Sequence, residues 1–128
     1  MATFSTAAQN AALDAYVDLL DVGAGANATL EIWAGTVGSG TLLGTLDFSA
    51  TAFAAAAGGS VSANSISDDP SADATGTAAN YSAKDKDGNE VFQGTVSNTG
   101  GGGELQLNTT AIVLGGPIQV TAFTLTHA

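Results

Sequence analysis

Residues 1–22 carry a helical pattern of apolar and polar positions. Thr6 and Gln9 have the spacing of a capping box, and Gly23 stands where a glycine often ends a helix. Between these signals the apolar side chains recur every three or four residues, on one face: Leu13, Tyr16, Val17 and Leu20. The pattern predicts one N-terminal helix, whose apolar face packs on the domain or reaches a neighbouring subunit.

Three carboxylates fall within a narrow arc on another face of this predicted helix: Asp14, Asp18 and Asp21. Asp18 and Asp21 lie near its C-terminal end, where negative charge opposes the helix dipole. A basic surface on a partner would relieve that cost. We therefore take Asp14, Asp18 and Asp21 as candidate partner contacts.

After residue 27 the apolar period changes to two, which is typical of half-buried strands. The segments expected to form strands are 29–33, 42–48, 61–66, 77–84, 90–96, 105–108, 111–114 and 118–126. The last of these is expected inside the sheet, with one face formed by Ile118, Val120 and Ala122.

Asp87-Gly88, placed between two alternating segments, is a strong hairpin signal. Seven or eight short strands separated by turns predict a mainly β fold. We expect an antiparallel β-sandwich or jelly-roll-like domain with one N-terminal α-helix. The chain of 128 residues suits a single domain, 1–128, with the helix in 1–22 and the β-sandwich in 28–128.

The composition predicts a thin core. Hydrophobic residues make up 45% of the chain, but many of them are alanine, which removes little apolar area from water. We expect contacts with copies of the chain, or with a larger assembly, to supply part of the stability.

The formal net charge is −10, and Lys84 and Lys86 are the only basic residues besides one histidine. This charge repels phosphate backbones and anionic lipid head groups, so we expect neither nucleic acid nor a membrane as partner. The start of the chain lacks the pattern of a signal peptide, which predicts synthesis in the cytoplasm and no secretion.

The sequence lacks a set of residues that could form a catalytic site. The only histidine, His127, lies next to the end of the chain, and there is no cysteine. No triad of nucleophile, histidine and acid can therefore be built in a structured region. We expect no enzyme, no cofactor, and no catalytic, cofactor-binding or metal residue.

Two acidic loops, 68–73 and 85–90, could hold a cation, but the second departs from the EF-hand pattern and both fit solvated loops. Trp33 is a further candidate contact. It fits packing or a subunit contact better than an exposed anchor for sugar, which usually needs more aromatic neighbours.

Several stretches together resemble a family of small structural proteins of tailed bacteriophages and prophages: 11–21, 30–35, 41–46, 73–78, 84–92 and 115–126. The resemblance covers nearly the whole chain and carries no catalytic motif.

The resemblance implies a virion component, most plausibly a capsid decoration (cement) protein that binds the outer head lattice and stabilises it. Its partner would then be the major capsid protein or another virion protein, and the chain would form a homo-oligomer, a trimer, at the lattice axes. Two alternatives stay open. One is a neck, tail or baseplate-associated part, and the other is a β-sandwich that binds carbohydrate or a host surface through Trp33.

Overall fold

The computed structural model describes residues 3–126 and confirms the mainly β fold with one N-terminal helix. Helix α1 (Thr6–Asp18) continues into the short 3-10 helix η1 (Leu19–Asp21). The strands are β1 (Thr29–Ala34), β2 (Thr41–Asp47), β3 (Ser60–Ser62), β4 (Gly76–Thr77), β5 (Asn80–Lys84), β6 (Glu90–Asn98), β7 (Leu105–Leu107), β8 (Ala111–Ile112) and β9 (Val120–Thr126).

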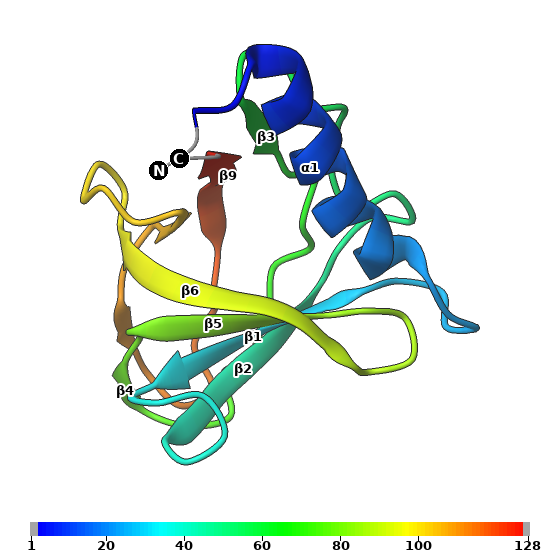
Figure 1. The fold of residues 1–128 in the computed structure, drawn as a ribbon. Helices are drawn as coiled ribbons and strands as arrows, with labels where there is room; N and C mark the ends of the chain where they lie inside the picture. Colours follow the sequence, from blue (N-terminus) through cyan, green and yellow to red (C-terminus); the bar gives the residue numbers. More distant parts are fainter. Residues whose placement is uncertain (1–2, 127–128) are drawn as a thin grey trace.

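One seven-stranded sheet has the order β2-β1-β5-β6-β7-β9-β3, and β4 pairs with β8 in a separate small sheet. Figure 1 shows β9 and β3 at a steep angle to β5 and β6, so that the large sheet bends around the core. Helix α1 lies over one end of this bend and contacts β3. The result is a sandwich-like domain, as the alternation of apolar residues predicts.

The pair β6–β7 is parallel, whereas the other pairs of named strands are antiparallel. Residues 99–104 make this connection, which usually needs a dozen residues or more. Glycine makes the short path possible: Gly100 and Gly102 have φ angles of 81° and 88°. The loop then folds back on β6, where the Gly103 amide donates to Ser97 Oγ at 3.0 Å.

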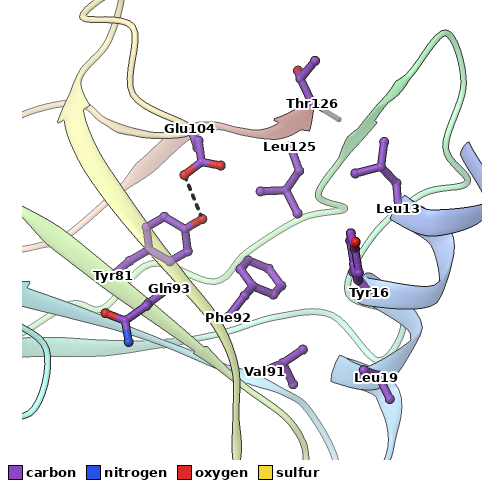
Figure 2. Close-up of a pocket in the computed structure, with 10 residues that line it drawn as sticks. All are labelled: Leu13, Tyr16, Leu19, Tyr81, Val91, Phe92, Gln93, Glu104, Leu125 and Thr126. Atoms are coloured by element: carbon purple, nitrogen blue, oxygen red, sulfur yellow. Dashed lines mark hydrogen bonds between the residues drawn. The ribbon is translucent and has the colours of Figure 1, made fainter. Parts of the chain in front are cut away.

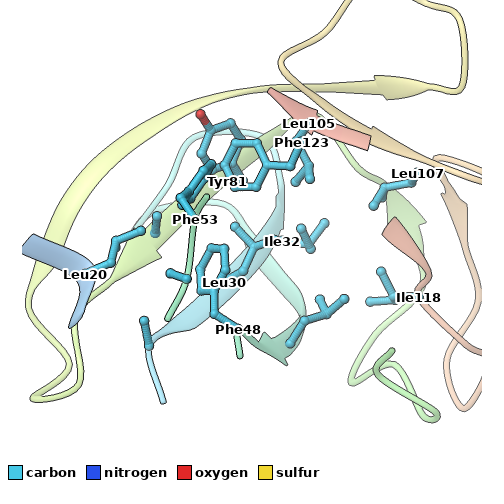
Figure 3. Close-up of a cluster of buried hydrophobic side chains, with 14 of the residues drawn as sticks. Leu20, Leu30, Ile32, Phe48, Phe53, Tyr81, Leu105, Leu107, Ile118 and Phe123 are labelled. Atoms are coloured by element: carbon cyan, nitrogen blue, oxygen red, sulfur yellow. The ribbon is translucent and has the colours of Figure 1, made fainter. Parts of the chain in front are cut away.

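Side chains from both parts of the bent sheet meet in one core (Figure 3). Phe123 of β9 lies at its centre, with ring centroids 4.9–6.3 Å from four other rings, those of Phe48, Phe53, Tyr81 and Phe92. The Phe48 pair is stacked and the others are tilted or edge-on, and such pairs add to the stabilisation from buried area. These five rings compensate in part for the many alanines of the chain.

The helix differs from the prediction at its start and on its apolar face. Ser5, not Thr6, is the N-cap, and its Oγ accepts a hydrogen bond from the Ala8 amide at 3.2 Å. The face buried against the sheet consists of Leu13, Val17 and Leu20, whereas Tyr16 is 50% exposed. Tyr16 lies at the margin of the stripe that the other three residues define.

The last strand also differs from simple alternation. Ile118 and Phe123 are buried, while Val120 is half-buried and Ala122 is exposed. The pairing with β7 is irregular here, since Gln106 faces Ala122 and Leu107 faces Val120. One extra residue in β9 reverses which side chains point inward. The strand is internal in the sheet, next to the edge strand β3.

Candidate functional site

The acidic face of α1 holds another part of the same chain. Asp14 Oδ1 accepts a hydrogen bond from the Ala56 amide at 2.8 Å, and Asp21 Oδ1 accepts one from the Ala52 amide at 3.0 Å. Asn10 Oδ1 binds the Gly59 amide in the same way at 2.9 Å. The helix therefore provides acceptors for the alanine-rich segment 52–59, which forms no helix of its own.

Of the three predicted acidic contacts, Asp18 is the exposed one, and no hydrogen bond of its side chain is found within residues 3–126. Asp14 and Asp21 are half-buried and have the intramolecular role just described. The structure does not present the three carboxylates as one free surface. As a partner contact, the prediction is best kept for Asp18.

Trp33 is half-buried on β1 and belongs to a small polar network. Its Nε1 donates to Glu31 Oε1 at 3.2 Å, and the other oxygen of Glu31 pairs with Lys84 Nζ at 3.1 Å. The indole N–H is therefore already bound within the chain. Trp33 lies apart from the acidic helix face, so the predicted contact residues do not form one site.

The carboxylates of loop 85–90 are used in hydrogen bonds to the backbone. Asp85 Oδ1 accepts from the amides of Asp87 and Asn89, both at 2.9 Å, as in an Asx turn. Asp87 Oδ1 accepts from the Ala24 amide at 3.0 Å. These bonds shape the hairpin tip and dock the segment that follows the helix onto it.

Loop 68–73 has a similar structural use. Asp69 accepts from the Ser71 and Thr45 amides at 3.0 and 3.3 Å, and Asp68 Oδ2 accepts from Gln119 Nε2 at 3.2 Å. No cluster of three or more histidine, cysteine, aspartate or glutamate residues that could hold a metal ion occurs in the described part of the chain. His127 lies outside the described residues.

Both edges of the large sheet are covered by the chain itself. Loop 67–73 follows β2, where Ser67 donates to Asp47 and Asp73 donates to Leu43 through their backbones. Along β3, the Ala54 amide donates to Ser62 and Ala57 exchanges hydrogen bonds with Ser60. Covered edges limit the addition of a strand from another chain. A partner is therefore expected on a face or in a groove.

An open groove of about 560 Å³ lies between α1 and the sheet (Figure 2). Its apolar lining comes from the helix, the hairpin and the last strand: Leu13, Tyr16, Leu19, Val91, Phe92 and Leu125. Leu19 is 53% exposed at its rim, so the groove is open to solvent. Pockets that bind ligands commonly have this size and this largely apolar lining.

The polar end of the groove is organised around Glu104 and Tyr81. The buried Tyr81 hydroxyl donates to Glu104 Oε1 at 3.4 Å, as the dashed line in Figure 2 shows. Burial, together with the negative charge of Glu104 and this hydrogen bond, raises the pKa of Tyr81 well above its usual range. Tyr81 therefore remains a neutral donor that holds one carboxylate oxygen in place.

Gly94 of β6 provides the room for this pair. A Cβ atom at this position would meet Glu104 Oε1 and would lie 2.7 Å from the Tyr81 hydroxyl. Tyr81 and Gly94 face each other across the β5–β6 pair. Only a residue without a side chain lets the carboxylate lie over the buried phenol.

Sequence reasoning missed this groove. Its lining comes from five separate stretches of the chain, and nothing local marks Phe92 or Glu104 as neighbours of α1. The one available signal is the width of the apolar face of the helix, where Tyr16 and Leu19 exceed what the core accommodates.

Comparison of the chain with family models, with curated proteins and with solved structures found no match. None of the helices within residues 3–126 is long and apolar enough to cross a membrane.

Proposed function

We propose that the chain is a structural component of a tailed-phage virion, a capsid decoration protein that binds the outer head lattice and stabilises it. The observation that carries a binding role is the open apolar groove beside α1, on a domain whose sheet edges are both covered. The virion assignment rests on the resemblance of the stretches described above.

The surface properties are compatible with this role. A decoration protein has to stay soluble and separate from its copies before it reaches the particle, and a net charge of −10 favours this. On a lattice with many equivalent sites, oligomeric subunits gain avidity, so each contact can be weak. A shallow groove and a few exposed apolar side chains are sufficient for such a contact.

The test is to add purified protein to undecorated heads of the parent phage. We expect saturation at a fixed number of copies per head and a rise in the temperature at which the heads melt. Electron cryo-microscopy of the same particles then shows where the chain lies. Binding at the neck, tail or baseplate would replace the decoration assignment with one of those locations, and no binding to any virion part would reject the proposal.

The carbohydrate alternative has less structural support, because Trp33 is half-buried and its indole N–H is bound to Glu31. A glycan array tests it directly. A signal that disappears in Trp33→Ala, with an unchanged fold, would favour the alternative over the virion role.

A further inference from the structure

We propose that the groove between α1 and β6 binds a basic side chain, arginine or lysine, on an apolar segment of the partner protein, and that Glu104 pairs with its charge. This inference deepens the proposed function and rests on it only for the identity of the partner. It assigns a contact surface and the chemistry of the segment that occupies it.

The first step is the acidic end of the groove. Glu104 Oε1 is held by the Tyr81 hydroxyl, whereas Oε2 has no hydrogen-bond partner within residues 3–126. Because Tyr81 is buried and its hydroxyl is already engaged, the free oxygen is the part of the pair that a ligand can reach. A carboxylate fixed on one side and open on the other is suited to accept a charged donor.

The second step is the aromatic lining. Phe92 of β6 and Tyr16 of α1 line the groove between Glu104 and its open rim, as Figure 2 shows. A guanidinium or ammonium group is attracted to the faces of such rings, and its aliphatic stem packs on apolar walls. Leu19 and Leu125 provide those walls. Aromatic rings, apolar walls and one carboxylate together favour a long basic side chain over an acidic or purely apolar one.

The third step is the charge of the chain itself. The protein carries ten net negative charges, and neither of its two lysines places a positive charge in the groove. Lys84 pairs with Glu31. Lys86 lies at the hairpin tip, where its backbone amide donates to the Val22 carbonyl. A second copy would bring the same negative charge and the same two lysines. Charge complementarity therefore favours a different, basic partner as the occupant.

The size of the groove indicates what accompanies the charge. At about 560 Å³ it has more room than one arginine side chain fills. Neighbouring apolar side chains of the same segment would cover Leu19 and Tyr16, which are half exposed in the free protein. We therefore expect a short segment in which leucine or a similar residue flanks the basic one.

A peptide experiment tests the site without any virion. The probe is the blocked peptide Ac-Leu-Ala-Arg-Ala-Leu-NH2. The control peptide has citrulline in place of arginine, which keeps the shape of the side chain and removes its charge. Amide chemical shifts of the labelled protein are followed during titration. We expect shifts concentrated at Tyr16, Leu19, Phe92, Gly94 and Glu104. Binding of the citrulline peptide should be weakened roughly threefold to fivefold, because Glu104 is an exposed carboxylate and exposed ion pairs are weak.

Two variants sharpen the titration. Glu104→Gln should reduce the preference for arginine over citrulline to less than twofold. Asp47→Asn is the matched control, because it removes the same charge from another exposed position, on the edge strand β2, which does not line the groove. It should keep the preference. Equal binding of both peptides by the unaltered protein, or shifts outside the groove, would overturn the inference.

A parallel measurement with undecorated heads separates this inference from the proposed function. If Glu104→Gln binds heads as tightly as the unaltered protein does, the decoration role stands and the groove is not the contact surface. If heads bind neither protein but the arginine preference holds, the proposed function fails and the basic-segment site remains. Self-association of the free protein that Leu19→Ser abolishes would show that a second copy covers the groove, contrary to the inference.

Discussion

The carboxylate of Asp14 in α1 accepts a hydrogen bond from the backbone amide of Ala56, 2.8 Å away. The two residues are far apart in sequence, and this bond fixes the alanine-rich segment against the helix. The segment has few large side chains with which to anchor itself. Polar side chains of the helix anchor the segment instead. The acidic face of the helix, which the sequence suggests is a free surface, therefore also holds the fold together.

Asp14→Ala should therefore destabilise the fold. The Ala56 amide loses its acceptor, and a partly buried unpaired N–H costs about 1–3 kcal/mol. Asp18→Ala is the control, since it removes the same charge from the same helix at an exposed position and should change the free energy of unfolding by less than about 0.5 kcal/mol. Urea denaturation compares the two variants. Equal effects would show that charge, not the hydrogen bond, determines the cost.

The alternation of apolar and polar residues correctly predicted those elements that are determined by residues close together in the sequence. Leu30 and Ile32 alternate with half-buried residues in β1, as expected, and the 85–89 turn joins β5 to β6. Length and alternation sufficed here because each of these elements is determined within about ten residues. The mainly β class and the N-terminal helix followed from them.

Features set by distant contacts could not be predicted in this way. The parallel pairing of β6 with β7 depends on the fold of the glycine loop, and the inward face of β9 depends on an irregular pairing with β7. The groove is the strongest case, because Glu104 and Tyr16 are brought together only by the bend of the sheet. Trp33 was found in the sequence as a notable residue, but its bond to Glu31 was not.

Replacing two glycines by alanine should distinguish the stability cost of backbone strain from the cost of steric crowding. Gly88 and Gly23 both have positive φ angles, 86° and 125°. A Cβ at Gly88 would meet open space, whereas one at Gly23 would lie 2.8 Å from the Asp87 backbone nitrogen. Gly88→Ala should cost about 1 kcal/mol from backbone strain, and Gly23→Ala a further 1–3 kcal/mol from overpacking. Thermal unfolding of both variants, side by side, measures the difference; a smaller cost at Gly23 would contradict the docked hairpin tip.

Tyr81 should make stability depend on alkaline pH. Its pKa is raised in the folded protein, so the unfolded chain ionises first, at about pH 10. The unfolded state then binds fewer protons than the folded one, and stability is lost as the pH rises above that value. Tyr81→Phe lacks this ionisation and should show a flatter decline between pH 9 and about pH 11. Urea denaturation at each pH gives the two slopes, and parallel slopes would contradict the raised pKa.

Substitutions at two adjacent helix residues should distinguish an effect on the core from an effect on the proposed contact surface. Val17 is 3% exposed and packs in the core, whereas Tyr16 is 50% exposed and lines the groove. Val17→Ser should cost about 2–4 kcal/mol in the free energy of unfolding, because it places an unsatisfied hydroxyl in an apolar site and leaves a cavity. Tyr16→Ser should change stability by less than about 1 kcal/mol while weakening binding of the arginine peptide. Denaturation and the peptide titration measure both effects. If Tyr16→Ser instead unfolds the protein, the groove is part of the core and not a surface for a partner, because only a residue that packs against its own chain contributes that much to folding.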